Sequence, residues 1–299
     1  MDTTKNNLPL PSFTTCLWFN GEGMDAAQFY TSIFSGSAIS QKVKNTEGSA
    51  LRKEGSDLTV AFTLSGQSFL ALNGGPQFKF NPSISFLINC DSEDEVNYFW
   101  KNLSDGGSVL MPLDKYPFSE KYGWLSDKFG VSWQIILSKN FPEKIIPALM
   151  FTGNVNGRAQ EAMKFYESLF PNGKIGTIKY YDNSQPPNLE GSVMFGDLKI
   201  ADKWFAAMDS GYDHQFSFNE AISFIVNCGS QKEIDYYWDN LTRDGDESQC
   251  GWLKDKFGIS WQIVPKILPE LLADKNRLPR VMNAFMKMKK FDIEQLKNA

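Results

Sequence analysis

The chain reads GWLSDKFGVSWQII at residues 123–136 and GWLKDKFGISWQIV at residues 251–264. Over the twelve positions that start at Trp124 and at Trp252, ten residues are identical. Other blocks recur in the same order: FYTSIF from Phe29 as FYESLF from Phe165, and FKFNPSISFLINC from Phe78 as FSFNEAISFIVNC from Phe216. The chain is therefore a tandem duplication, and the polar, proline-containing stretch at residues 139–144 suits the boundary between the copies.

Each copy has strand and helix signals in the order β-α-β-β-β, twice over. The first helix of each copy has an apolar face with the same spacing: Ala26, Tyr30, Ile33 and Phe34, then Ala162, Tyr166, Leu169 and Phe170. The second helix of each copy starts at an S-x-x-E capping box: Ser92 with Glu95, then Ser230 with Glu233. Gly106 and Gly245 follow these helices, where a positive φ is favoured. The chain thus holds four β-α-β-β-β units.

Composition excludes several classes of function. The chain has 299 residues, 42% of them hydrophobic and 22% charged, and a net charge of −5. An acidic protein of this kind is not expected to bind nucleic acid or an anionic membrane nonspecifically. We expect no signal peptide and no membrane span. Because Cys16, Cys90, Cys228 and Cys250 form no C-x-x-C pair, we expect reduced thiols in a cytoplasmic protein.

Several motifs resemble one known family. They are CLWFNGEGMDAAQFYTSIF, FLALNGGPQFKFN, ISFLINC, WLKDKFGISWQIVP and the closing RVMNAFMKMKKFDIEQL. They are similar to the PhnB-like branch of the glyoxalase/bleomycin-resistance/dioxygenase superfamily, also called the vicinal oxygen chelate superfamily. This branch carries the domain name 3-demethylubiquinone-9 3-methyltransferase.

The resemblance implies an α+β fold of tandem glyoxalase-like domains. In each domain, two β-α-β-β-β units would form a curved, mostly antiparallel eight-stranded sheet around a cleft. We expect a first domain at residues 1–141, a second at 142–272, and a helical tail at 273–299 that packs on them through Val281, Phe285 and Met288. Such a chain is expected to be a monomeric pseudodimer or a homodimer.

The metalloenzymes of the superfamily take His and Glu ligands from four strands of the cleft. At the corresponding positions the first copy has the neutral residues Thr14 or Thr15, Asn73, Ser85 and Gln134. In the second copy the strand-four position falls near Asp209, a lone carboxylate, the third position falls near Ser223, and the fourth is Gln262. First-row metals need imidazole, thiolate or carboxylate donors. The sequence therefore predicts no metal site and no cofactor. A weak site at His214, with Asp209 and Asp213, is the alternative.

The same resemblance leaves enzymatic activity open. One histidine cannot supply a His-dependent triad to both copies. A methyltransferase would need a glycine-rich turn in a parallel doubly wound sheet, and Gly21 with Gly23 is a weak match that the second copy does not repeat. Core packing is the simplest role for Cys90 and Cys228.

Residues of the final hairpin are the best candidates for contacts with a ligand. On its last strand Ser132, Gln134 and Ile136 share one face, and Trp133 and Ile135 share the other. We predict a protein that binds a small organic molecule through Gln134, Gln262, Asn73, Asp209, Trp124 and Trp252. The alternatives are a glyoxalase-like or lyase-like enzyme, the named methyltransferase, and a structural or partner-binding pseudodimer. For the tryptophans, simple core packing is the competing interpretation.

Overall fold

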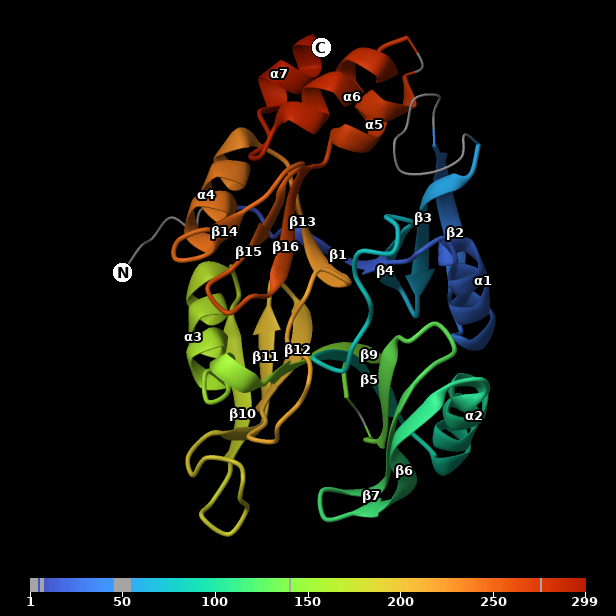
Figure 1. Cartoon of the computed structure of the whole chain (residues 1–299), viewed down its shortest axis with the longest axis vertical. Coiled ribbons are helices and arrows are strands. Elements are labelled where there is room, and N and C mark those ends of the chain that lie inside the picture. The colour runs from blue at the N-terminus through green and yellow to red at the C-terminus, as the bar shows by residue number, and fades with distance from the viewer. Residues whose placement is uncertain (1–4, 6–7, 46–54, 140, 275) are drawn as a thin grey trace.

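The computed structural model describes residues 5, 8–45, 55–139, 141–274 and 276–299 (Figure 1). It contains two eight-stranded mixed sheets and helices, which confirms the predicted α+β class with two eight-stranded sheets. In sheet A the strand order is β14 (Asp246–Glu247), β15 (Trp252–Lys254), β16 (Ser260–Pro265), β13 (Ile222–Cys228), β1 (Ser12–Trp18), β4 (Gln67–Leu72), β3 (Asp57–Leu64), β2 (Ala38–Lys44). In sheet B it is β10 (Lys174–Tyr180), β11 (Val193–Ile200), β12 (Lys203–Asp209), β9 (Ile145–Phe151), β5 (Ile84–Cys90), β8 (Ser132–Leu137), β7 (Ser119–Ser126), β6 (Ser108–Tyr116).

The pairing of units differs from the sequence-based prediction, which placed the two units of one copy in one sheet. Sheet A joins the first unit of the first copy to the second unit of the second copy, through antiparallel β1 and β13. Sheet B joins the other two units through antiparallel β5 and β9. Five of the seven strand pairs in sheet A are antiparallel, so the predicted sheet type is correct.

Aromatic packing between the two units of one copy explains why they lie in different sheets. Helix α1 (Gly23–Ile33) belongs to sheet A, and helix α2 (Glu93–Ser104) to sheet B. Phe34, at the end of α1, packs on Phe99 of α2 at 4.8 Å, and Tyr30 packs on Trp133 at 5.4 Å between ring centroids. The two units of a copy thus meet through their helix-bearing faces, and each completes a sheet with a unit of the other copy.

Helices α3 (Ala159–Leu169) and α4 (Gln231–Leu241) repeat this arrangement on the other side of the molecule (Figure 1). The predicted capping boxes are confirmed, because Ser92 accepts a hydrogen bond from Glu95 N and Ser230 accepts one from Glu233 N. Gly106 has the predicted positive φ of 72°. Gly245 does not; the residue before it, Asp244, takes the left-handed conformation with φ 62°. An aspartate tolerates this conformation, so the second copy ends its helix without using the glycine.

The repeated D-K-F-G turn is a buried hydrogen-bonded hub that ties the two sheets together. The Asp127 carboxylate accepts hydrogen bonds from Tyr30 Oη (2.7 Å) and Trp133 Nε1 (2.8 Å), and from the backbone N–H groups of Phe129 and Val131. Burial raises the pKa of this carboxyl, and the four donors lower it in part. Asp255 has the equivalent four donors from Tyr166, Trp261, Phe257 and Ile259. This shared structural role accounts for the strong repetition of the hairpin sequence.

The C-terminal tail is helical and packs on the second copy, as predicted, but it begins at Leu268 and not at residue 273. It comprises α5 (Leu268–Ala273), α6 (Leu278–Lys287) and α7 (Ile293–Asn298), at the top of Figure 1. Val281 is fully buried, and Phe285 and Met288 pack against the core. The tail backbone also bonds the two residues before β15, because Cys250 N donates to Met288 O and Gly251 N donates to Lys289 O.

Within the described part of the chain, no helix is long and apolar enough to cross a membrane. The sequence predicts no signal peptide at the start of the chain. Part of that segment, residues 1–4, 6 and 7, lies outside the described residues. The predicted core cysteines, Cys90 and Cys228, are fully buried with free thiols.

Candidate functional site

Alternation along the strands gives each sheet a core face and an outer face. On β8, Trp133 and Ile135 lie in the main hydrophobic core together with the helices. Ser132, Gln134 and Ile136 therefore point to the opposite side, which we call the outer face. This confirms the predicted division of residues along this strand. Trp133 is core, whereas the outer face holds the candidate Gln134.

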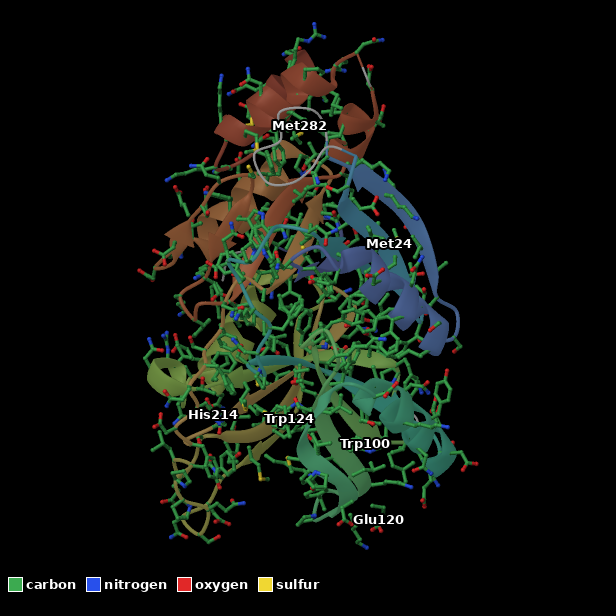
Figure 2. All side chains as sticks on the ribbon, turned by 45° about the vertical axis from the view of Figure 1, so that its right-hand side comes forward. Met24, Trp100, Glu120, Trp124, His214 and Met282 are labelled. Atoms are coloured by element: carbon green, nitrogen blue, oxygen red, sulfur yellow. The ribbon has the colours of Figure 1, made fainter. Side chains whose placement is uncertain are left out.

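On the outer face of sheet B, Gln134 is held entirely by other side chains. Its Nε2 donates to Ser85 Oγ at 2.7 Å, and its Oε1 accepts from Tyr122 Oη at 2.8 Å. Beside it, the half-buried Trp124 donates from Nε1 to Ser132 Oγ at 2.8 Å. Trp124 is thus a neighbour of Gln134 and not a core tryptophan; Figure 2 labels it in the lower half of the molecule.

A second hydrophobic cluster lies on this outer face, separate from the main core. Leu87, Ile146, Ala148 and Ala206 are buried in it, although they lie on the face opposite the helices. Half-buried side chains from three strands and one loop pack against them: Ile136, Phe141, Phe195, Trp204 and Met208. The buried members of this cluster are direct neighbours across paired strands, Leu87 opposite Ile146 and Ala148 opposite Ala206. This gives sheet B an apolar surround for a small polar cluster.

On sheet A the equivalent outer face is more polar. Gln262 Nε2 donates to Ser223 Oγ at 3.0 Å, as its counterpart does in sheet B. Cys16 pairs with Ser223 across β1 and β13, and it takes the place of Ala148. Burial raises the pKa of the Cys16 thiol to about 11, and hydrogen bonds with Gln262 and Ser223 lower it in part. The thiol is thus neutral at pH 7.

The tryptophans of sheet A lie beside this cluster. Trp252 is opposite Gln262 in the β15–β16 pairing, and its ring is 5.9 Å from that of Trp18, edge to face. Trp18 Nε1 donates to the carbonyl oxygen of Gly75 at 2.8 Å. Both indoles are half-buried. The hairpin candidates, Gln134 with Trp124 and Gln262 with Trp252, are therefore brought together on the two outer faces.

The other two candidates, Asn73 and Asp209, lie elsewhere. Asn73 Oδ1 accepts from Gly23 N, at the start of α1. Asp209 accepts from Gly157 N, Ala159 N and Val193 N, so it holds the start of α3. Both are nearly fully buried and bond the backbone on the helix side of their sheets. Their polar atoms stabilise the loops before two helices.

The residues present do not fit a first-row metal. At the strand positions where the superfamily carries ligands, the outer faces offer hydroxyls, amides and the Cys16 thiol, which are a poor donor set. Among the described residues, no group of three His, Cys, Asp or Glu side chains is close enough to hold an ion. The alternative site at His214 is not formed, since its Nε2 lies 2.7 Å from Ser210 Oγ and Asp209 bonds the backbone. Burial lowers the pKa of His214.

Two cavities of the described structure are lined by neither Gln134 nor Gln262. The larger, of about 310 Å³, lies between the loop before α3 and the D-K-F-G turn of sheet A, with Arg158, Lys256 and Asp246 in its wall. The smaller, of about 20 Å³, lies between the two sheets beside Glu143 and Trp204. The outer faces are instead filled by their own side chains, and Gln134 and Gln262 are only 6% and 7% exposed.

Sequence reasoning missed two residues of the outer faces. Cys16 lies on β1, in the first copy, yet it meets Gln262 from the second copy, and the assumption of one sheet per copy hid this contact. Tyr122 bonds Gln134 only in sheet B, because the second copy has Cys250 at the equivalent position, two residues before Trp252. Comparing the copies position by position would have identified both differences.

One protein-family profile matches both copies of the chain. The profile described as 3-demethylubiquinone-9 3-methyltransferase matches the chain twice, at residues 11–136 and 143–264. No curated protein matches the chain.

Two solved structures are similar to the chain. A protein from Bacillus cereus, described as a 3-demethylubiquinone-9 3-methyltransferase, PhnB protein, is 40% identical over 42% of this chain and 98% of its own, with a TM-score of 0.40. Glyoxalase I from Zea mays is 13% identical, covers 92% of this chain and 99% of its own, and has a TM-score of 0.58. The second likeness shows the fold alone.

Proposed function

We propose that this chain, which belongs to the 3-demethylubiquinone-9 3-methyltransferase family of glyoxalase-like, PhnB-like proteins, binds a small organic molecule on the outer faces of its two sheets. One observation carries the proposal. Each outer face has a buried glutamine that donates to a serine of the neighbouring strand and lies beside a half-buried tryptophan. A few polar groups in an apolar surround are the usual composition of a small-molecule site.

The architecture favours binding over methyl transfer, the activity that the family description names. A methyltransferase of the common kind binds its cofactor at a glycine-rich turn of a parallel doubly wound sheet. Here the sheets are mostly antiparallel, and the Gly23 N–H of the candidate turn is already bonded to Asn73. A glyoxalase-like or lyase-like reaction would need a base or nucleophile, and the neutral Cys16 thiol is a poor one.

The chain supplies both sheets by itself, because each sheet takes one unit from each copy. We propose that it acts as a monomeric pseudodimer, for which light scattering should give a mass near 33.8 kDa. We also propose a cytoplasmic location, since the free buried thiols of Cys16, Cys90 and Cys228 suit a reducing compartment.

The experiment that tests ligand binding is a thermal-shift screen of small organic compounds followed by calorimetry of each hit. Gln134→Leu should weaken a ligand of sheet B, and Gln262→Leu a ligand of sheet A, by about 1–3 kcal/mol through loss of one polar partner. Lys256→Ala, in the 310 Å³ cavity, is the control and should leave the affinity unchanged. Unchanged affinity in both glutamine variants, with a loss in Lys256→Ala, would refute the proposal.

A further inference from the structure

The two outer faces differ at one hydrogen bond that the repeat predicts to be shared. In sheet B, Trp124 Nε1 donates to Ser132 Oγ. In sheet A the equivalent pair is Trp252 and Ser260, and this bond is not made. Ser260 is fully buried, and its Oγ has no hydrogen-bond partner among the described residues. A buried hydroxyl without a partner is rare and unfavourable, so it indicates a group that something else satisfies.

A single replacement between the copies accounts for the missing bond. Trp18 follows Leu17 on β1, and the corresponding residue of sheet B is Met150, which follows Leu149 on β9. The Trp18 ring is fixed by its bond to Gly75 O and by its contact with Phe78 at 5.0 Å. It lies at 80° to the Trp252 ring, an arrangement in which aromatic rings attract each other. We infer that Trp18 draws the Trp252 indole away from Ser260.

The result is a pair of unused donors next to two aromatic rings. Because Ser260 Oγ has no partner among the described residues, its hydroxyl is free to donate, and the Trp252 indole N–H does not use it as an acceptor. Both groups complement an acceptor such as a carbonyl oxygen. The edges and faces of Trp18 and Trp252 complement a flat apolar ring. Sheet B lacks this combination because Ser132 and Tyr122 already complete its polar groups.

We propose that the outer face of sheet A binds a flat, conjugated carbonyl compound, whose oxygen accepts hydrogen bonds from Ser260 and Trp252 while its ring contacts Trp18. This rests on the proposed function, and it names the chemical class and the sheet. Because Ser260 is buried, the half-buried Trp252 is the side chain that moves to admit the ligand. The Gln262 amide, opposite Trp252 on the next strand, lines the same site.

The test uses two probes that differ at one group, 4-hydroxyacetophenone and 4-ethylphenol. Each is titrated into the ¹⁵N-labelled full chain, and the indole N–H resonances are followed by NMR after assignment with Trp252→Phe and Trp124→Phe. The ketone should shift the Trp252 resonance saturably, and 4-ethylphenol should bind roughly tenfold more weakly because it leaves the donors unpaired.

Two variants and a control make the test specific. Ser260→Ala should weaken the ketone about tenfold and leave 4-ethylphenol unchanged, since one of the two donors is lost. Trp18→Met reproduces the sheet B residue, so it should restore the Trp252–Ser260 bond and abolish the preference for the ketone. Ser132→Ala is the matched control on sheet B and should not alter ketone binding.

Three outcomes would overturn the inference. Equal affinity of Ser260→Ala and the parent chain for the ketone would exclude Ser260 as a donor. Saturable shifts at Trp124 alone would place the ligand on sheet B, so the proposed function would survive without this inference. Absence of saturable shifts at both indoles, with either probe, would count against both.

Discussion

The outer faces of sheets A and B descend from the same repeated hairpin but carry different chemistry. Sheet B pairs its glutamine and tryptophan with Tyr122, Ser85 and Ser132, within an apolar cluster. Sheet A has Cys16 where sheet B has Ala148, and Trp18 where it has Met150, and it leaves the Ser260 hydroxyl unpaired. The hub aspartates, by contrast, have the same four donors in both copies. Duplication thus kept the parts that join the sheets and allowed the outer faces to diverge.

The largest expected effect concerns the part that is the same. Asp127→Ala and Asp255→Ala should each lower the free energy of unfolding by about 3 kcal/mol, because each leaves a buried tyrosine hydroxyl and a buried indole N–H without a hydrogen-bond acceptor. Urea denaturation measures the change. If one copy tolerated the substitution with a loss below about 1 kcal/mol, the two hubs would not be equivalent.

The next effect separates the outer faces. Gln134→Leu should lower the free energy of unfolding by about 2 kcal/mol, since it leaves both Tyr122 and Ser85 without their partner. Gln262→Leu should lower it by about half as much, because in sheet A only Ser223 and the weakly bonding Cys16 thiol lose a partner. The same urea titrations give both values. Equal losses would mean that the tyrosine bond in sheet B contributes nothing.

A smaller effect depends on pH and on sheet A alone. Burial raises the pKa of Cys16 from 9.0 to about 11, so the folded state favours the neutral thiol. Its contribution to stability is complete below pH 9 and is lost as the pH rises towards 11. Between pH 8 and pH 10 the parent chain should lose about 1 kcal/mol more stability than Cys16→Ala. Thermal unfolding at each pH measures the change. An equal loss of stability in the parent chain and in Cys16→Ala would contradict the assigned environment of the thiol.

The smallest effect is a difference between two serines. Ser132→Ala removes the bond to Trp124 and should lower the free energy of unfolding by about 1 kcal/mol. Ser260→Ala removes an unpaired buried hydroxyl and should leave stability unchanged or slightly higher. Differential scanning calorimetry of the two variants measures this. A loss of similar size in Ser260→Ala would show that its hydroxyl is paired within the protein.

Much of this fold follows from the sequence, because local patterns determine it. The helix faces around Tyr30 and Tyr166, the capping boxes at Ser92 and Ser230, and the alternation about Gln134 all depend on spacing within a few residues. The pairing of the sheets does not. Four similar units can pair into two sheets in more than one combination. Contacts such as that between Phe34 and Phe99, which are 65 positions apart, favour the observed pairing.

The candidate site was predictable in part for the same reason. The repeat singled out Gln134 and Gln262 with Trp124 and Trp252, and the structure does place each pair on one face. It could not show that Tyr122 already satisfies Gln134, or that Cys16 meets Gln262 from the other copy. These contacts depend on strand neighbours that only the assembled sheets define.

The central claim is that ligands bind on the outer faces, and a crystal structure of the chain with a thermal-shift hit tests it most directly. The account predicts electron density for the compound beside Trp252 and Gln262 on sheet A, or beside Trp124 and Gln134 on sheet B. Density for the compound in the 310 Å³ cavity next to Arg158 and Lys256, with both outer faces closed by their own side chains, would contradict it.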